Sequence, residues 1–264
     1  MQMEASVSQY PSERRQLIAN VIEQNARASV AELSELLSVS EVTIRKDLAV
    51  LEAEGNIVRT HGSAVASNRS RVELAFEVRE RLHWDEKALI GAEAASLVND
   101  GDSIALDAST TALQIARNLK ARRELTVVTN GIRIASELAS QPSITVLMPG
   151  GAVRWEAFSL VGKWGTMMLR QLNIQKAFVG AVGFTLAEGL TDVSAEEAEI
   201  KKAMVGNAKE VIGVFDHTKW DRVAMATFCV MEKLRLVISD ERAPADMVAA
   251  VRSRGVEVRL VGGR

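Results

Sequence analysis

The sequence predicts an α/β protein in two parts: an N-terminal winged helix-turn-helix domain, then a Rossmann-like domain built on a largely parallel sheet. Two observations support this prediction. Residues 29–54 contain two short capped helical patterns separated by a tight turn, which is the arrangement of a helix-turn-helix. From Ser103 onward, short apolar runs alternate with helical patterns, as in parallel sheets whose strands are joined by helices.

The composition is that of a globular protein with a sizeable core. The chain has 264 residues, of which 47% are hydrophobic and 25% charged, and this length predicts one or two domains. No apolar run reaches about 18 residues, so no membrane partner is expected, and no secretory signal is expected at the N-terminus. The single Cys229 and three scattered histidines predict no disulfide, no metal site and a cytoplasmic protein.

The first elements in order are a loose tail over residues 1–10 and a helix from about Pro11 to Gln24. Proline suits the first turn of a helix, and apolar side chains recur at helical spacing after it. The second helix is short and begins at Ser29, which forms a capping box with Glu32. Its apolar side, predicted to face the core, consists of Val30, Leu33 and Leu37.

The third helix, over residues 41–54, has the surface of a DNA-reading helix. Ile44, Leu48 and Leu51 fall at i, i+4 and i+7 and form one apolar stripe. The remaining surface carries short side chains, a hydroxyl and two cations, as a helix that enters the major groove requires. Any amphipathic surface helix would show the same stripe, so the capped helix and short turn before it decide the interpretation. Ser40 is predicted to cap this helix.

Residues 56–64 predict a small hairpin, which after a recognition helix is the wing of a winged helix. The hairpin combines β-branched residues with a polar turn that contains Gly62. Arg59 and His61 would then lie where a wing contacts the DNA backbone or the minor groove. For His61, an exposed turn residue is a slightly better explanation.

The residues predicted to contact DNA come from the first helix, the recognition helix and the wing. They are Arg14, Arg15, Ser40, Glu41, Thr43, Arg45, Lys46, Arg59 and His61. Charge argues against DNA binding, because the net charge is −2 and residues 1–66 hold six Lys or Arg against nine Asp or Glu. Only charges on the contacting face meet phosphates, however. We therefore expect weak non-specific binding and a dependence on dimerisation. A solvated helix end explains Arg14 or Arg15 alone equally well.

Residues 66–75 are small and polar and predict a linker, so the two domains are expected at residues 11–65 and 76–264. A helix of small apolar residues over 90–97 begins the second domain. Seven short apolar runs then predict strands, at 103–107, 125–129, 144–148, 176–180, 211–215, 236–239 and 256–260.

Three polar loops follow three of these strands, where ligands bind in open α/β sheets. Residues 107–111 offer hydroxyls and the N–H groups of the next helix, which suit a phosphate. The second loop is 129–131. The third contains Gly150 and Gly151, which let a backbone approach an anion, with Arg154 behind them. Each loop alone is more often a helix cap or a turn, but three on one edge favour a phosphorylated ligand.

Three lysines in the last third of the chain are further candidates for binding an anion. Lys219 follows the strand at 211–215, where it either reaches an anion at the same edge or lies in solvent. Lys201 and Lys202 lie one turn into a helix capped at Ser194, and a solvated helix face explains them, Lys202 above all.

These motifs resemble the DeoR family of bacterial transcription regulators. The resemblance rests on Thr43 to Leu48 after Ser40, and on the motifs Asp-x-Ser-Thr-Thr, Val-Thr-Asn, Gly-Gly and Asp-x-Thr-Lys. It implies a sensor domain related in fold to sugar-phosphate isomerases, which binds a phosphorylated sugar. This sequence departs from the family pattern at Ala108, where members of the family commonly have Gly. The implied effector residues are Asp107, Ser109, Thr110, Thr111, Asn130, Gly150, Gly151 and Lys219, to which the polar loops add Thr129 and Arg154.

The sequence therefore predicts a DNA-binding transcription regulator, a repressor of a sugar or amino-sugar catabolic operon that a phosphorylated sugar relieves. Its partner would be double-stranded operator DNA, and it would act as a homo-oligomer, a dimer or tetramer, without cofactor, metal or catalytic residues. One alternative is an isomerase-like enzyme that uses Asp107, Glu196 and Lys219 as acid, base and electrophile. The other is a sensor that binds protein instead of DNA.

Overall fold

The computed structural model describes residues 11–24, 27–53, 57–60, 63–66 and 76–262. The predicted tail (1–10), most of the predicted linker (67–75) and His61 lie outside the described residues. The chain divides into two units, Met1–Val78 and Arg79–Arg264, and buried apolar side chains fill each of them. No helix in these described stretches is long and apolar enough to cross a membrane.

The N-terminal unit is a helix-turn-helix followed by a strand hairpin. Its helices are α1 (Pro11–Gln24), α2 (Val30–Leu37) and α3 (Glu41–Ala53). Its antiparallel sheet has the order β1-β3-β2, formed by β1 (Arg27–Ser29), β3 (Ser63–Ala66) and β2 (Ile57–Thr60). The predicted helix pair and wing hairpin are confirmed. β1, which was not predicted, adds a third strand beside β3.

Hydrogen bonds cap the start of α2 and hold the turn that follows it, where the Ser34 hydroxyl donates to the carbonyl of Val39 at 2.6 Å. The Oγ of Ser29 accepts a hydrogen bond from the N–H of Glu32 at 3.2 Å, and the Glu32 carboxylate accepts one from the N–H of Ser29 at 2.7 Å. Ser38 adopts a left-handed φ of 52° at the end of α2, as residues that end helices often do. The predicted stripe of α3 is buried, with 3% or less exposed at Ile44, Leu48 and Leu51.

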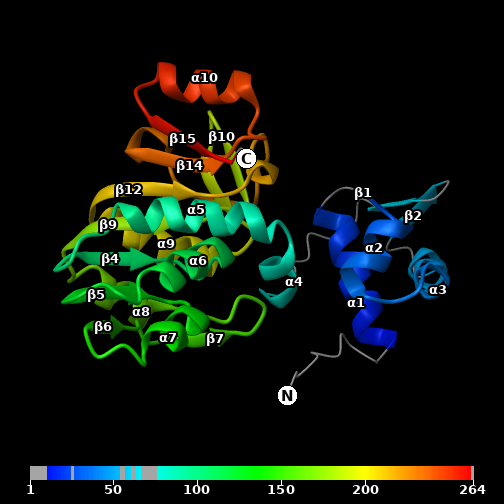
Figure 1. Ribbon diagram of the computed structural model, residues 1–264, viewed down its shortest axis with the longest axis horizontal. Helices are drawn as coiled ribbons and strands as arrows, with labels where there is room; N and C mark the ends of the chain where they lie inside the picture. The colour runs from blue at the N-terminus through cyan, green and yellow to red at the C-terminus, as the bar shows by residue number, and fades with distance from the viewer. Residues whose placement is uncertain (1–10, 25–26, 54–56, 61–62, 67–75, 263–264) are drawn as a thin grey trace. The chain divides into compact units, whose positions relative to one another are not determined.

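The C-terminal unit is built on a seven-stranded sheet whose neighbouring strands all run parallel. Figure 1 shows the strands in the order β15-β14-β12-β9-β4-β5-β6. The interior strands are buried on both faces, as parallel strands between helical layers must be. In chain order they are β4 (Ser103–Leu106), β5 (Leu125–Thr129), β6 (Ile144–Leu147), β9 (Ile174–Val179), β12 (Ala208–Val214), β14 (Leu236–Asp240) and β15 (Glu257–Val261).

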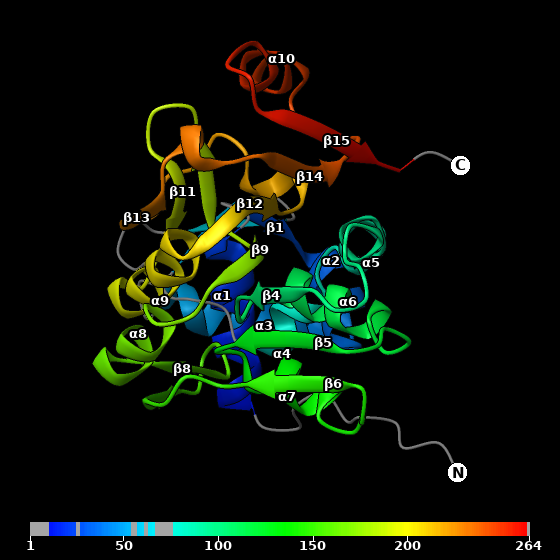
Figure 2. The same ribbon diagram turned by 90° about the vertical axis from the view of Figure 1, so that its left-hand side faces the viewer.

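Helices cover both faces of this sheet. α5 (Trp84–Ser96) and α6 (Thr110–Asn118) lie on one face, and α8 (Lys163–Leu169) and α9 (Ala195–Gly206) lie on the other (Figures 1 and 2). The predicted layered α/β architecture is therefore confirmed. The remaining helical segments are α4 (Phe76–Arg81), which spans the division between the units, α7 (Ile132–Leu138), α10 (Ala245–Ser253), and the short 3₁₀ turns η1 (His217–Lys219) and η2 (Met231–Lys233).

Two small antiparallel sheets accompany the main sheet and were not predicted. One is the hairpin of β7 (Ala152–Arg154) and β8 (Ser159–Val161). The other has the order β10-β11-β13, formed by β10 (Gly183–Thr185), β11 (Gly189–Asp192) and β13 (Ala226–Cys229). These strands have three or four residues and contain polar residues or glycine, so they show neither a continuous apolar run nor an alternating pattern.

The second small sheet contributes to a buried aromatic core. Phe184, Phe215 and Trp220 pack ring against ring, with centroids 5.2 to 5.6 Å apart. Cys229 belongs to the same cluster and is 2% exposed. Burial raises the pKa of its thiol to about 12.

The order of the strands places a switch in winding direction between β4 and β9. From β4 the chain winds outward through β5 to β6, and from β9 it winds the other way through β12 and β14 to β15. Because neighbouring strands are parallel, their carboxyl ends share one edge of the sheet. In open α/β sheets, ligands bind outside the carboxyl ends of the strands at such a switch point.

Candidate functional site

The recognition helix α3 presents the predicted polar surface. Ser40 caps it, because its Oγ accepts a hydrogen bond from the N–H of Thr43 at 3.2 Å. The Ser40 and Thr43 hydroxyls are also bonded to each other at 2.9 Å. Arg45 is exposed and pairs with Glu41 at 2.6 Å, while Lys46 is exposed one turn beyond Val42.

Arg14 and Arg15 both form ion pairs with Asp47 inside the N-terminal unit. The guanidinium of Arg14 pairs with Asp47 at 2.6 Å, with side chains only 12% and 5% exposed, and Arg15 lies 3.9 Å from the same carboxylate. Arg14 therefore ties α1 to the buried side of α3. Arg59 pairs through its backbone with Ala64 in the wing, whereas its side chain and the whole of His61 lie outside what the structure describes.

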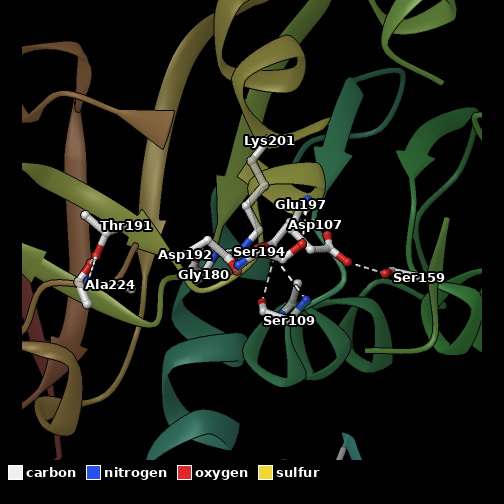
Figure 3. Close-up of polar contacts among 12 residues, drawn as sticks. Asp107, Ser109, Ser159, Gly180, Thr191, Asp192, Ser194, Glu197, Lys201 and Ala224 are labelled. Atoms are coloured by element: carbon white, nitrogen blue, oxygen red, sulfur yellow. Dashed lines mark hydrogen bonds and ion pairs between the residues drawn. The ribbon is translucent and has the colours of Figure 1, made fainter. Parts of the chain in front are cut away.

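A buried lysine organises the switch point in the C-terminal unit. The Nζ of Lys201, on α9, lies 2.9 Å from Asp107 and 2.7 Å from Asp192, and donates to the carbonyl of Gly180 at 3.1 Å. Asp107 follows β4, Asp192 ends β11 and Gly180 follows β9. Figure 3 shows the Lys201 side chain running from α9 toward these three residues. One ammonium group thus joins four segments of the chain.

The ion pairs at Lys201 keep its charge in spite of burial. Burial alone lowers the pKa of an ammonium, but Asp107, Asp192 and Glu197 outweigh it and raise the pKa of Lys201. Burial alone raises the pKa of Asp192, but the effect of Lys201 is larger and the pKa is lowered. The prediction of a solvated helix face is wrong for Lys201, which is 5% exposed. For the neighbouring Lys202, which is exposed, that prediction is confirmed.

Glu197 is a second buried centre, one turn before Lys201 on α9. Its carboxylate accepts hydrogen bonds from the Ser159 hydroxyl and, at 3.1 Å, from the Asn130 amide, and it pairs with Arg154 at 3.2 Å. Burial raises its pKa in spite of these partners. Glu197 therefore connects α9 with the β7–β8 hairpin and the loop after β5. Glu197 and Lys201 are four residues apart and therefore share one face of α9. This spacing was the signal in the sequence that could have identified Glu197 as buried, and this signal was missed.

Asn130 carries an unpaired acceptor inside this centre. Its Nδ2 donates to Glu197 and to the carbonyl of Leu160 at 3.3 Å, and these two acceptors fix which end of the amide is nitrogen. Its Oδ1 is buried and has no hydrogen-bond partner among the described residues. Thr129, the residue before, is used locally, since its Oγ1 accepts from the N–H of Gly131 at 3.0 Å.

The loop after β4 is arranged as a helix cap packed against β9. The Oγ of Ser109 donates to Asp107 at 2.7 Å and accepts from the N–H of Ala112 at 3.1 Å. A Cβ on Gly180 would come 2.6 Å from the Cβ of Ser109, so only glycine fits there. Two further predicted residues, Thr110 and Thr111, are buried in the first turn of α6. The first N–H groups of that helix have no acceptor within it.

The two glycines after β6 differ in their surroundings. Gly151 has a φ of +152°, and a Cβ there would lie 2.1 Å from the carbonyl oxygen of Val161. Gly151 therefore allows the close approach of the β7–β8 hairpin. A Cβ on Gly150 would meet nothing within 4 Å, so the backbone is open on that side.

Lys219 lies at the same sheet edge, in η1 after β12, within a cluster rich in cations. Burial lowers its pKa, Asp216 opposes this, and Arg222 and Arg79 lower it further. Burial alone raises the pKa of Asp216, but Lys219 and Lys87 outweigh it and bring it to about 2. The structure gives no direct contact between Lys219 and Lys201, but Arg79 lowers the pKa of both Lys219 and Asp192, so the two charge clusters at this sheet edge are neighbours.

Lys87 binds the C-terminal end of α4 at this edge of the sheet. Its ammonium donates to the carbonyl of Leu82 at 2.6 Å and to that of Arg79. Burial, only partly offset by Asp216, lowers its pKa to about 7. The Arg79 side chain in turn donates to the carbonyl of Glu156, between β7 and β8, at 3.4 Å. α4 is therefore linked both to the cation cluster and to the hairpin that Glu197 holds.

Glu196, which the enzyme alternative requires as a base, is exposed on α9. Its neighbour Glu197 occupies the buried position, and it is held there by Ser159, Arg154 and Asn130. The proposed acid, base and electrophile are therefore not gathered in one place.

Two protein families match the chain in succession. Residues 14–70 match the family described as the DeoR-like helix-turn-helix domain, and residues 82–241 match the DeoR C terminal sensor domain.

Several curated proteins are similar over nearly the whole chain. The HTH-type transcriptional regulator GolR of Listeria innocua is 35% identical, over 95% of this chain and 99% of its own. A putative aga operon transcriptional repressor of Escherichia coli O157:H7 is 32% identical, over 95% and 94%. The HTH-type transcriptional repressor GlcR of Bacillus subtilis is 32% identical, over 94% and 96%.

Among solved structures, ribose 5-phosphate isomerase A of Methanocaldococcus jannaschii is 22% identical. The match covers 52% of this chain and 54% of the isomerase, with a TM-score of 0.38.

Proposed function

The chain belongs to the DeoR family of transcriptional regulators, and on this premise we propose that it represses a sugar or amino-sugar catabolic operon in the cytoplasm. A phosphorylated sugar bound to the C-terminal unit would release the operator DNA. Two relatives are named as repressors, one of them of an aga operon. The isomerase alternative is not favoured, because the relatives are regulators and Glu196 points to solvent.

The observation that best supports a sugar effector is the unpaired oxygen of Asn130. A buried acceptor without a partner costs about 1–3 kcal/mol, and a ligand hydroxyl is a donor of the right kind. Asn130 Oδ1 belongs to the Glu197 centre, where carboxylate oxygens offer further acceptors. A ligand with several adjacent hydroxyl groups satisfies such a set, which is the chemistry of a sugar.

The phosphate of the effector requires positive charge that is not already neutralised. Lys201 does not supply it, because Asp107 and Asp192 both pair with it. The cluster around Asp216 is the better candidate, because the ammonium groups of Lys219 and Lys87 both interact with this buried carboxylate, and Glu80 has only a smaller effect on Lys87. We assign the phosphate to Lys219 and to the first-turn N–H groups of α6 at Thr110 and Thr111, as helix N-termini favour anions.

The effector would act by favouring one of two states of the sensor unit. Such a shift requires that the effector bind the two states with different affinities. We propose that α4 transmits the change, because Lys87 and Arg79 attach it to the cation cluster and to the β7–β8 hairpin. The regulator would act as a dimer or tetramer, since helix-turn-helix proteins read paired half-sites.

A fluorescence anisotropy titration on the DNA upstream of the protein's own operon tests this proposal. Each titration is run with a panel of sugar phosphates and with the unphosphorylated parent sugars. We expect tight duplex binding that one sugar phosphate releases and its parent sugar does not. Lys219→Met should raise the required effector concentration about tenfold or more, the effect of one charged hydrogen bond. The exposed Lys202→Met should leave it unchanged.

Two outcomes would contradict the proposal in different ways. Duplex binding that no sugar phosphate alters would overturn the effector assignment and leave the DNA-binding assignment intact. An absence of duplex binding at low salt, with or without sugars, would overturn the repressor assignment as a whole.

A further inference from the structure

The first turn of α3 exposes an apolar side chain that the fold does not use. Val42 is 59% exposed, and the other exposed large apolar side chain in the described part of the N-terminal unit is Val50, at 38%. Val42 lies opposite the buried stripe that begins at Ile44. Valine is also a weaker helix former than the straight-chain residues. Neither the core nor the helix therefore explains its presence.

The side chains around Val42 are already engaged. The Thr43 hydroxyl is bonded to Ser40 in the cap, and Arg45 is paired with Glu41 across one helical turn. Val42 thus lies in a turn whose conformation is fixed by the cap and by an ion pair. A β-branched side chain in a helix has one strongly preferred rotamer. The two methyl groups of Val42 are therefore held rigidly on the outer surface.

This position meets base edges when a recognition helix enters the major groove, because the N-terminal residues of that helix reach them. Thymine alone among the bases carries a methyl group on its major-groove edge, and apolar side chains recognise it by contact. We propose that Val42 is a specificity-determining residue that contacts the C5 methyl of one thymine for each bound recognition helix. This inference rests on the proposed binding of operator DNA.

Replacement of thymine by deoxyuridine tests the contact atom by atom. The full-length protein first selects its preferred duplex from a randomised pool, and each thymine of that duplex is then replaced singly by deoxyuridine. For the unmodified protein, we expect that replacing one particular thymine per bound helix weakens binding about fourfold. This is the change in affinity that the burial of one methyl group produces. Val42→Ala should bind the thymine duplex more weakly and lose this discrimination.

Val50→Ala is the matched control, because it shortens an exposed valine two turns further along the same helix. It should keep the deoxyuridine profile of the unmodified protein. The inference is overturned if Val42→Ala still discriminates fourfold, or if no thymine affects the unmodified protein. A protein that enriches no duplex at all would overturn the DNA-binding assignment together with this inference.

Discussion

Lys201 and Lys202 are adjacent on α9 and have opposite surroundings. Lys201 is 5% exposed between two carboxylates, whereas the side chain of Lys202 is 49% exposed. Lys201→Met leaves Asp107 and Asp192 buried without a counter-charge, and we expect it to lower the free energy of unfolding by about 3–5 kcal/mol. Lys202→Met should change it by less than about 0.5 kcal/mol. Urea denaturation measures both, and similar losses would refute the role given to Lys201.

Asp216 makes the stability of the protein depend on pH in acid. Its pKa in the folded protein is about 2, below the ordinary value of 3.8, because Lys219 and Lys87 outweigh the effect of burial. The carboxylate therefore stabilises the fold above pH 3.8, and this contribution, about 2 kcal/mol, is lost as the pH falls toward 2. Asp216→Asn should flatten the loss of stability over this range. The same change at the exposed Asp221 should not, and identical curves for the two variants would contradict the prediction.

At the scale of one element, the β7–β8 hairpin depends on a single glycine. Gly151→Ala places a Cβ 2.1 Å from the Val161 carbonyl at a φ of +152°, and we expect a loss of about 2 kcal/mol or more in the free energy of unfolding. The adjacent Gly150→Ala meets open space and should be neutral within about 1 kcal/mol. Thermal unfolding of both variants decides the matter, and a Gly150→Ala variant as unstable as Gly151→Ala would argue against this account.

The helix α4 is expected to carry the signal out of the sensor. Lys87→Met removes the ammonium that binds the carbonyls of Arg79 and Leu82, while Lys219 stays in place. The variant should bind operator DNA alone as before, and at saturating effector the effector should change its operator affinity at least about fivefold less than in the unmodified protein. Anisotropy with and without effector measures this coupling, with Lys202→Met as the control. Undiminished coupling would exclude Lys87 from signal transmission.

Regular elements were predictable from the sequence because each has several residues that repeat a pattern. The strand predicted at 125–129 is β5 without change, and that at 176–180 is β9 displaced by one or two residues. Single buried side chains have no such repetition. Lys201 and Glu197 look like surface residues of an ordinary capped helix. Only the fold shows that the segments at β4, β9 and β11 bring two carboxylates and a carbonyl to Lys201, and that the β7–β8 hairpin and the loop after β5 bring polar partners to Glu197.

At the scale of the whole molecule, DNA affinity depends on which cations remain available, and in the described part of the N-terminal unit some of them are already paired. Arg14 and Arg45 are neutralised by Asp47 and Glu41, which leaves Lys46 exposed on the recognition helix. If Lys46 contacts one phosphate, Lys46→Met should reduce the slope of log affinity against log salt by about 0.9 for each bound helix. Titrations at several salt concentrations measure the slope. An unchanged slope would mean that Lys46 does not touch the DNA backbone.

The burial of Cys229 makes this regulator suitable for conversion into an optical sugar sensor. The chain has 1 cysteine, and with a pKa of about 12 its thiol stays protonated and unreactive at neutral pH. A thiol introduced by Trp164→Cys, at a side chain that is 78% exposed, would therefore be labelled alone, without first removing a native cysteine. A dye at that position, on α8 next to the helix that carries Glu197 and Lys201, would report effector binding in the intact protein without any DNA.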